Sequence, residues 1–511
     1  MSDLRAHRFL WPLVDARATA TPDALFAVDE GGETLSFAGY RDRALRCAAG
    51  LARMGVETGT VVSWQLPTRL DSLVLMAGLS RLGAVQNPIL PILRAREVGF
   101  IARQTAARWL FVPRVFRGFD FEDMAREVAS GLPGLRVRVT DDGLPDADPD
   151  ALPPVPEVHP SRPPVRWILY SSGTTADPKG VRHTDPSVAA PGRAMVESFE
   201  ATAADRHAFV FPLTHIGGVN WVFSGLMAGF AHVCVEAFRP DETIPFLARH
   251  GVTLAGAGTA FHQAYLAARR ERGAEPVLPD VRCFPGGGAP KPPTLFHELK
   301  EATGAPIVSG YGLTEHPIAT MGRLTDPEPD LAQSEGRATP GTSLRIVRAD
   351  GTAAGPDEEG EVRVRGPHLF RGYVDSSLDA AAFDEDGSLR TGDLGSLDAA
   401  GFLRITGRLK DVIIRKGENV SAKEVEDHLY AHPKVTDVAV VGLPDEERGE
   451  LVCAVVVAPE PLGFDEMWDW LERRGLMRQK FPERLEHVAE IPRNPSGKVL
   501  KRELQRTFGA D

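Results

Sequence analysis

The chain has 511 residues, of which 43% are hydrophobic and 25% are charged, and this ordinary globular composition supports a normal core and excludes large-scale disorder. Its 58 Lys and Arg against 70 Asp and Glu give a formal net charge of −12, which argues against nucleic acid as a partner and against a polybasic surface for anionic lipid. The 4 cysteines are dispersed and form no CxxC pair, so we expect neither a zinc site nor a disulfide framework.

Helix-like and strand-like segments alternate through the first half of the chain. Residues 71–82 have a helix-like apolar pattern that Gly83 ends, and residues 84–89 can form a strand. Alternation of this kind favours a doubly wound α/β sheet. Residues 141–164 are rich in Pro and Asp and predict a surface loop, after which residues 165–170 form a strand-like run.

Two segments are considered as a possible signal peptide and a possible transmembrane helix. Residues 1–23 carry scattered charges and no uninterrupted apolar core, so we expect no signal peptide. Residues 219–238 are largely apolar, but polar residues interrupt them and Gly229 divides them. We therefore expect a buried helix that ends near Gly229, a buried strand over residues 231–235, and no transmembrane segment. With the cysteine usage, this predicts a cytoplasmic protein.

The pattern changes after residue 341. Short strand-like runs, broken by glycine turns, predict a β-rich subdomain at about residues 341–407. Its predicted strands cover residues 344–347, 361–364 and 402–405.

A second unit is predicted beyond the β-rich subdomain, because the last hundred or so residues have their own alternation. Its predicted elements are helices over residues 420–430 and 464–474 and strands over residues 435–441 and 451–457. We therefore divide the chain into an N-terminal domain, residues 1–409, and a C-terminal domain, residues 410–511.

A polar loop that contains glycine follows the strand-like run at 165–170. It reads Ser171-Ser172-Gly173-Thr174-Thr175-Ala176-Asp177-Pro178-Lys179-Gly180. Hydroxyl and backbone N–H groups donate to phosphate oxygens, glycine lets the backbone approach, and lysine supplies positive charge. The loop is not a Walker A sequence, because GxxxxGK[ST] is absent. By composition alone, a flexible polar loop remains the alternative to a phosphate site.

Further motifs follow along the chain. They are Phe211-Pro212-Leu213-Thr214-His215, Gly286-Gly287-Gly288-Ala289-Pro290, Ser309-Gly310-Tyr311-Gly312-Leu313-Thr314-Glu315, Thr391-Gly392-Asp393, Gly407-Arg408-Leu409-Lys410-Asp411, Gly417-Glu418-Asn419-Val420-Ser421 and Pro492-Arg493-Asn494-Pro495-Ser496-Gly497-Lys498. Taken singly, each has an ordinary interpretation, since a glycine cluster is usually a turn and a lone His is usually structural.

Together with the loop at residues 171–180, these motifs resemble the signature of the acyl-adenylate-forming superfamily, which includes acyl-CoA synthetases, peptide-synthetase adenylation domains and beetle luciferases. The loop of that family usually reads SGTTGxPKG, and here Ala176 stands where the last glycine of SGTTG is usual. The resemblance covers nearly the whole chain. It implies an α/β fold with a large lobe of doubly wound subdomains, a β-rich subdomain, and a small, mobile α+β C-terminal domain.

The resemblance also implies a role for each group of residues. ATP or AMP would be bound by Ser171, Ser172, Gly173, Thr174, Thr175, Lys179, Gly287, Gly288, Ala289, Ser309, Gly310, Tyr311, Gly312, Leu313, Thr314, Asp393, Arg408 and Lys498. The acyl pocket would be lined by His215, Gly217, Gly218, Trp221, Gly258, Thr259 and Gly286. The catalytic residues would be Lys498, Thr314, Glu315 and His215. The metal ligand would be Glu315, the hinge would be Lys410, and the CoA tunnel would be lined by Gly417 and Glu418.

The implied reaction has two half-reactions and uses ATP, Mg²⁺ and coenzyme A. A substrate carboxylate would attack the α-phosphorus of ATP while Lys498 bridges carboxylate and phosphate, and no general base is needed because the carboxylate is already ionised. The C-terminal domain would then rotate about Lys410, and a thiol would displace AMP. Coenzyme A is the expected thiol, and a separate acyl carrier protein is the alternative.

The acid itself is constrained only in part. In the peptide-synthetase adenylation domains that the chain resembles, an Asp near the His215 region binds an α-ammonium group. Residues 212–219 contain no carboxylate here, so the resemblance favours an acid without an α-amine. Glycines among the pocket candidates would leave space for a medium or long aliphatic chain or an alicyclic acid, and an aryl acid stays open. Residues 412–421 look most like medium-chain and cyclohexanecarboxylate-type CoA ligases.

Two other hypotheses belong to different functional classes. The first is a non-catalytic nucleotide or acyl-adenylate sensor, which would need one of Glu315, Asp393, Arg408 or Lys498 to be replaced, and all are present. The second is a luciferase-like oxygenase. The sequence leaves the oligomeric state open, a homodimer included.

Overall fold

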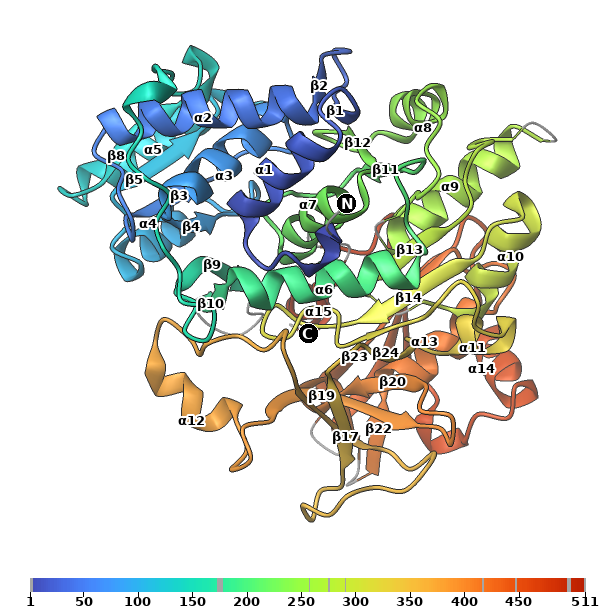
Figure 1. The fold of residues 1–511 in the computed structure, drawn as a ribbon. Coiled ribbons are helices and arrows are strands. Elements are labelled where there is room, and N and C mark those ends of the chain that lie inside the picture. The colour runs from blue at the N-terminus through green and yellow to red at the C-terminus, as the bar shows by residue number, and fades with distance from the viewer. Residues whose placement is uncertain are drawn as a thin grey trace.

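The chain forms a mixed α/β structure with several separate sheets (Figure 1). The computed structural model describes residues 3–171, 178–256, 258–273, 276–289, 291–415, 418–445, 448–493 and 498–509. We refer to residues up to 409 as the large lobe and to residues from 410 as the small lobe. The predicted α/β fold class is confirmed.

One six-stranded sheet of the large lobe leads into the predicted phosphate loop. Its strands lie in the order β10 (Lys179–Thr184), β9 (Val165–Ser171), β4 (Val85–Pro88), β3 (Val61–Trp64), β5 (Trp109–Val112) and β8 (Arg136–Val139). Neighbouring strands are parallel except for the antiparallel pair β9 and β10. The helices of this region are α3 (Leu70–Leu82), α4 (Ala95–Gln104) and α5 (Phe121–Ser130), and a short hairpin joins β6 (Val115–Phe116) to β7 (Phe119–Asp120). The predicted helix at 71–82 and strand at 165–170 are confirmed, and Gly83 ends α3.

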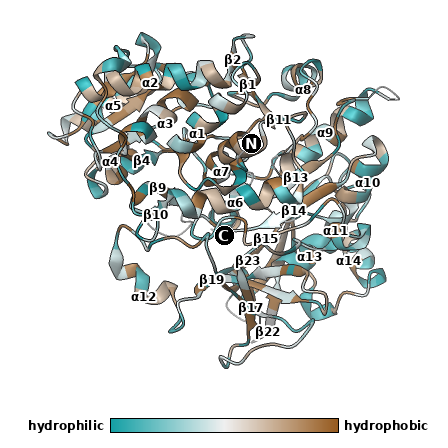
Figure 2. Ribbon diagram, viewed as in Figure 1, coloured by the Kyte–Doolittle hydropathy of each residue, from teal (hydrophilic) through white to brown (hydrophobic). Residues whose placement is uncertain are grey.

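A four-stranded sheet stands beside it with the order β11 (Arg206–Phe209), β12 (Ala231–Cys234), β1 (Leu25–Val28) and β2 (Thr34–Ser36). The helices of this part are α1 (Leu10–Ala20), α2 (Phe37–Arg53), α6 (Asp185–Ser198), α7 (Ile216–Ala228) and α8 (Pro240–Arg249). As predicted, the apolar run at 219–238 is a buried helix ending at Gly229 and then a buried strand. Figure 2 shows α7 as one of the most hydrophobic helices, in the interior of the lobe. Within the described ranges, no helix has the length and apolarity needed to cross a membrane.

Two further four-stranded sheets belong to the large lobe. The first has the order β13 (Phe284–Gly287), β14 (Ile307–Tyr311), β15 (Thr320–Met321) and β16 (Arg337–Ala338), with helices α9 (Thr259–Glu271), α10 (Pro293–Thr303) and α11 (Glu328–Gln333). The second has the order β17 (Ser343–Val347), β18 (Gly360–Arg365), β19 (Leu389–Leu397) and β20 (Leu403–Arg408), with the short helix α12 (Asp379–Ala382). This second sheet confirms the β-rich segment, and β19 is a central strand that the sequence pattern did not predict.

The small lobe has its own five-stranded sheet. Its strands run β22 (Glu418–Ser421), β21 (Val412–Arg415), β24 (Gly449–Val457) and β23 (Asp437–Asp445), and β25 (Arg484–His487) pairs with β24. The helices are α13 (Ala422–Tyr430), α14 (Phe464–Arg473) and α15 (Lys501–Phe508). The helix predicted to start at residue 420 begins two residues later, because Val420 and Ser421 pair with β21 and the Ser421 hydroxyl accepts the N–H of Glu424 as the helix cap.

Short 3₁₀ turns join several of these elements. They are η1 (Leu4–Ala6), η2 (Thr140–Asp142), η3 (Pro149–Ala151), η4 (Ser376–Leu378), η5 (Leu409–Asp411) and η6 (Arg478–Lys480). The turn η5 contains Lys410 and directly joins β20 of the large lobe to β21 of the small lobe. The predicted hinge therefore lies at a single covalent crossing between two independently paired sheets.

Candidate functional site

A cavity of about 330 Å³ lies where the large and small lobes meet. Tyr311 at the end of β14, Asp393 in β19 and Arg408 at the end of β20 line it from the large lobe. Lys410 and Lys498 line it from the small lobe. Residues predicted from four distant motifs are therefore gathered around one space.

Asp393 is the buried carboxylate at the centre of this group, with 3% of its surface exposed. Its Oδ2 accepts a hydrogen bond from the Tyr311 hydroxyl at 2.7 Å. Its Oδ1 forms an ion pair with the Arg408 guanidinium, Nε to Oδ1 2.8 Å, since Asp393 and Arg408 stand opposite each other in the antiparallel pair β19–β20. A carboxylate held this way presents a fixed, charged acceptor at the cavity wall.

The turn that carries Asp393 is fixed by three hydrogen bonds. Gly392 has φ of 69°, a left-handed conformation that a side chain would strain, and its N–H donates to Glu361 Oε1 at 3.0 Å. The Thr391 hydroxyl donates to the carbonyl of Val362 at 2.7 Å and accepts the N–H of Asp393 at 3.1 Å. The Thr-Gly-Asp sequence is thus tied to β18 on both sides of the glycine.

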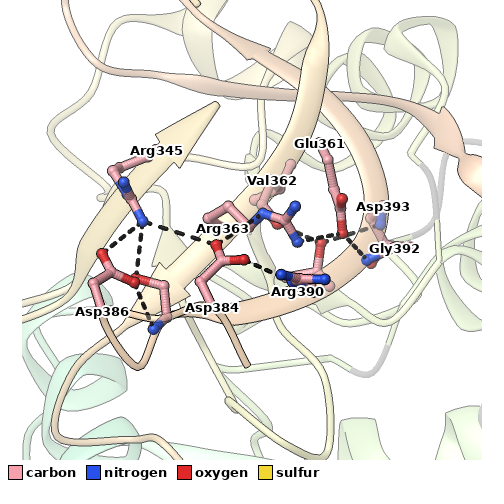
Figure 3. Close-up of polar contacts among 11 residues, drawn as sticks. Arg345, Glu361, Val362, Arg363, Asp384, Asp386, Arg390, Gly392 and Asp393 are labelled. Carbon is pink, nitrogen blue, oxygen red and sulfur yellow. Dashed lines mark hydrogen bonds and ion pairs between the residues drawn. The ribbon is translucent and has the colours of Figure 1, made fainter. Parts of the chain in front are cut away.

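An ion-pair network beside this turn supports it (Figure 3). Arg363 forms ion pairs with Glu361 at 2.9 Å and with Asp384 at 3.3 Å. Asp384 also pairs with Arg390 at 2.6 Å. Because Glu361 holds Gly392 as well, the network connects the backbone position of Asp393 to strands β18 and β19.

The Thr314-Glu315 segment follows β14 and is held by residues from other elements. The buried His183 side chain donates from Nε2 to the carbonyl of Thr314 at 2.7 Å. The Tyr373 hydroxyl donates to Glu315 Oε1 at 2.8 Å. Lys179 lies over the Tyr373 ring at 5.4 Å, so the lysine of the predicted phosphate loop and the predicted metal ligand share one aromatic neighbour.

The phosphate loop is described only at its two ends. Ser172, Gly173, Thr174 and Thr175 lie outside the described residues, and Ser171 is described as the last residue of β9 without its side chain. Lys179 begins β10 and pairs with Ser171 across the hairpin. The two described ends of the loop therefore lie side by side in an antiparallel pair, and Lys179 lies near the Tyr373 side chain that holds Glu315.

Lys498 is half-buried, and the pKa of its ammonium group is lowered to about 8 by burial first and then by the positive charges of Arg408 and Lys410. The pKa of Lys410 is also lowered, mainly by burial. Lys498 is held close to this charged group because Arg493 and Val499 form an antiparallel bridge and Leu500 N–H donates to the carbonyl of Pro492 at 2.8 Å.

Of the predicted CoA-tunnel residues, Gly417 lies outside the described part of the chain. Glu418 begins β22, and only its backbone is described. Neither residue's predicted role is tested by the described contacts.

The residues predicted to line the acyl pocket divide into two groups. His215 caps the N-terminus of α7, where its Nδ1 accepts the N–H of Gly217 at 3.1 Å, and burial lowers its pKa to about 4, so the imidazole is neutral at physiological pH. Thr259 begins α9, next to Gly258, which lies close to the carbonyl of Gly287.

The second group is used for packing. A Cβ on Gly218 would lie 2.6 Å from the carbonyl oxygen of Pro212, and one on Gly286 would lie 2.8 Å from the hydroxyl of Ser309. The prediction that glycines open space is therefore wrong at these two positions, because neighbouring chain already fills it. Trp221 is 5% exposed and stacks on His207 at 3.8 Å, which does not favour contact with a substrate.

The sequence analysis missed several residues that build the site. Tyr373 and His183 hold Glu315 and Thr314, and Glu335, Lys423 and Glu426 line the cavity. Tyr373 lies 58 residues from Glu315, so no local spacing relates them.

Comparison with known proteins agrees with this geometry. The profile of the AMP-binding enzyme family matches residues 14–374, and that of the AMP-binding enzyme C-terminal domain matches residues 424–498. The chain is 31% identical to the medium-chain fatty-acid–CoA ligase of Escherichia coli (strain K12) over 97% of this chain and 90% of that protein. It is 33% identical to the salicyl-AMP ligase / salicyl-S-ArCP synthetase of Mycobacterium tuberculosis over 98% of this chain and 91% of that protein.

A solved structure gives the same result. The ATP-bound structure of MatB from Rhodopseudomonas palustris superimposes with a TM-score of 0.87 at 26% identity, covering 98% of this chain and 99% of that one. The match covers nearly the whole chain and therefore extends over both lobes. The chain belongs to the AMP-binding enzyme family.

Proposed function

We propose that this protein is an AMP-forming acyl-CoA synthetase that activates a carboxylic acid with ATP and transfers the acyl group to coenzyme A. The observation that carries the proposal is the cavity in which Tyr311 and Asp393 face Lys498. An aromatic side chain and a carboxylate suit a nucleoside, whereas a lysine suits the phosphate and the acid that react beside it.

In the first half-reaction, the residues of this chain bind the substrates and neutralise their negative charge, and no proton transfer is required. The acid is ionised at neutral pH and can attack the α-phosphorus directly, which breaks the α–β phosphate linkage and releases pyrophosphate. Asp393 accepts the ribose hydroxyls, and the Lys498 ammonium neutralises the charge that is shared between carboxylate and phosphate. Thr314, held by His183, donates to a phosphate oxygen.

Glu315 is proposed to hold Mg²⁺ that arrives with ATP. Mg²⁺ is commonly bound by one or two carboxylates together with substrate phosphates, and Glu315 supplies one carboxylate, fixed by the Tyr373 hydroxyl. The ion would supply charge neutralisation to the phosphate oxygens. Among the residues that the structure describes, no group of three or more His, Cys, Asp or Glu side chains could hold a metal ion by itself.

In the second half-reaction we propose that the small lobe, residues 410–511, turns about Lys410 relative to the domain of residues 1–409. This movement would remove Lys498 and bring the Gly417–Glu418 turn to the cavity, where a thiol attacks the acyl carbon and AMP leaves. Coenzyme A is the proposed thiol. A separate carrier protein is the second candidate, because one relative of this chain is a salicyl-S-ArCP synthetase.

The proposed acid has no α-amine and carries a medium or long aliphatic chain or an alicyclic ring. The absence of a carboxylate at residues 212–219 and the likeness to a medium-chain fatty-acid–CoA ligase support this class. The neutral His215 is the polar side chain proposed to border the acyl group. A cytoplasmic location fits cytosolic ATP and coenzyme A.

The test is pyrophosphate release by the purified protein with MgATP and a panel of acids, with and without coenzyme A, and with the products identified by mass spectrometry. Octanoate or cyclohexanecarboxylate converted to a CoA thioester is the expected result. Acyl-adenylate without thioester would assign a carrier protein as acceptor, and no pyrophosphate with any acid would contradict adenylation.

The pH dependence of adenylation follows from the Lys498 pKa. The ammonium form is present below about pH 8, so kcat/KM for pyrophosphate release should be highest there and fall as the pH rises through that value. Lys498→Arg is the control, because a guanidinium stays protonated and residual activity should lack this fall. A wild-type profile that stays flat across this range would contradict the assignment.

A further inference from the structure

A chain of hydrogen bonds crosses from the large lobe to the segment that carries Lys498. Gln263 of α9 donates from Nε2 to the hydroxyl of Tyr430 in α13 at 2.8 Å. The Tyr430 hydroxyl donates to Asp437 Oδ1 at 2.5 Å. Arg493 donates from Nη2 to both oxygens of the same carboxylate, at 2.7 Å and 2.9 Å.

The four side chains of this hydrogen-bonded series are all partly buried, and partial burial strengthens the hydrogen bonds between them. Tyr430 and Gln263 are half-buried, and the side chains of Asp437 and Arg493 are 19% and 18% exposed. A hydrogen bond to a partly buried charged group is shorter and stronger than a neutral one at the surface. The Tyr430 hydroxyl is both an acceptor and a donor: it accepts a hydrogen bond from Gln263 of the large lobe and donates one to Asp437 of the small lobe.

Arg493, the last residue of this series, holds the segment that carries Lys498. The backbone of Arg493 is bridged to Val499, the residue after Lys498, and the carbonyl of Pro492 accepts the N–H of Leu500 at 2.8 Å. The contact between the Arg493 side chain and Asp437 therefore fixes the start of this segment against β23. Because Tyr430 also bonds to Asp437, a movement of Tyr430 relative to Gln263 would shift Asp437 and, with it, the segment that carries Lys498.

The first member belongs to the helix that begins at the predicted acid site. Thr259 and Gln263 are four residues apart in α9, so their side chains lie on the same face of the helix. The acid would contact the start of α9 near Thr259, and Gln263, one helical turn later, makes the hydrogen bond to the small lobe. The rigid helix α9 thus connects the predicted acid site to the segment that carries Lys498.

We propose that Gln263 and Tyr430 form an interlobe latch that positions Lys498 for adenylation. The inference rests on the proposed function. It assigns the latch to the first half-reaction alone, because thioester formation from a finished acyl-adenylate does not require Lys498 in the cavity. Gln263 and Tyr430 are positioning residues and touch no reacting atom.

The experiment compares Gln263→Met and Tyr430→Phe with wild type in the two half-reactions. Each variant should lower kcat/KM for pyrophosphate release by roughly 5- to 10-fold, while conversion of synthetic acyl-adenylate to thioester stays within about twofold. The double variant should be no slower than Tyr430→Phe, since both changes break the same bond. Gln104→Met is the matched control, because Gln104 accepts a hydrogen bond from the Tyr170 hydroxyl at 2.6 Å within the large lobe.

The outcomes separate the latch from the proposed function. Wild type that makes no acyl-adenylate from any acid would refute the function itself. An active wild type with unchanged adenylation in both variants would overturn the latch only. An equal loss in both half-reactions, or the same loss in Gln104→Met, would also overturn it, because the effect would then be one of general stability.

Discussion

Replacement of Lys498 by alanine is expected to lower acid-dependent pyrophosphate release by about 10²-fold or more. The Lys498 ammonium is one of the positive charges that the small lobe contributes to the cavity beside Arg408 and Asp393. Without it, the charge shared by carboxylate and α-phosphate in the transition state loses the ammonium group that bridges the two reacting groups. The measurement is initial pyrophosphate release at saturating MgATP with the best acid of the panel.

The same variant should still convert synthetic acyl-adenylate to CoA thioester at a rate close to that of wild type. This contrast separates a catalytic role from misfolding, which would lower both rates. Lys434→Ala is the matched control, because Lys434 lies in the small lobe and pairs with Glu466 at 2.8 Å away from the cavity. Near-normal adenylation by Lys498→Ala would remove this residue from the mechanism.

Asp393→Asn is expected to weaken AMP binding by roughly 10- to 100-fold, which corresponds to about 1.5–3 kcal/mol for lost hydrogen bonds to a charged acceptor. Asparagine keeps the shape of the side chain but loses the charge that pairs with Arg408, and it can accept on only one of the two atoms. Titration calorimetry with AMP measures the loss without depending on turnover.

A control for this prediction lies beside the same sheet. Asp386→Asn removes an ion pair with Arg345 at 2.7 Å at the exposed end of the ion-pair network, away from the Glu361 side chain that holds Gly392 (Figure 3). It should leave AMP affinity within about twofold, because a surface ion pair contributes little and does not contact the cavity. Unchanged AMP affinity in a folded Asp393→Asn protein would show that the ribose is bound elsewhere.

The sequence determined the elements whose signals are local. The apolar period of α3 and the glycine after it predicted a helix that ends at Gly83, and the same reasoning divided the apolar run at 219–238 into α7 and β12. Strand β19 was missed because residues 389–397 contain two glycines and several polar residues, and its pairing with β18 and β20 supplies what its own residues do not.

The sequence also predicted which motifs belong to the candidate site, because the order and spacing of the motifs resemble one family. Tyr311, Asp393, Arg408 and Lys498 were predicted as one group, and the cavity gathers them. The role of glycine could not be determined in this way. Whether a missing side chain leaves space or admits a neighbouring chain depends on what packs there, and at Gly218 and Gly286 it admits neighbours.

Only the tertiary structure decided how the site residues are held. Tyr373 fixes Glu315 across 58 residues of chain, and Gln263 meets Tyr430 across 167. Periodicity and turn chemistry act over a few residues, so the sequence expresses them directly. A hydrogen bond between distant side chains exists only after sheets and helices have packed, and that long-range pairing is what makes a set of motifs into a cavity with a positioned lysine.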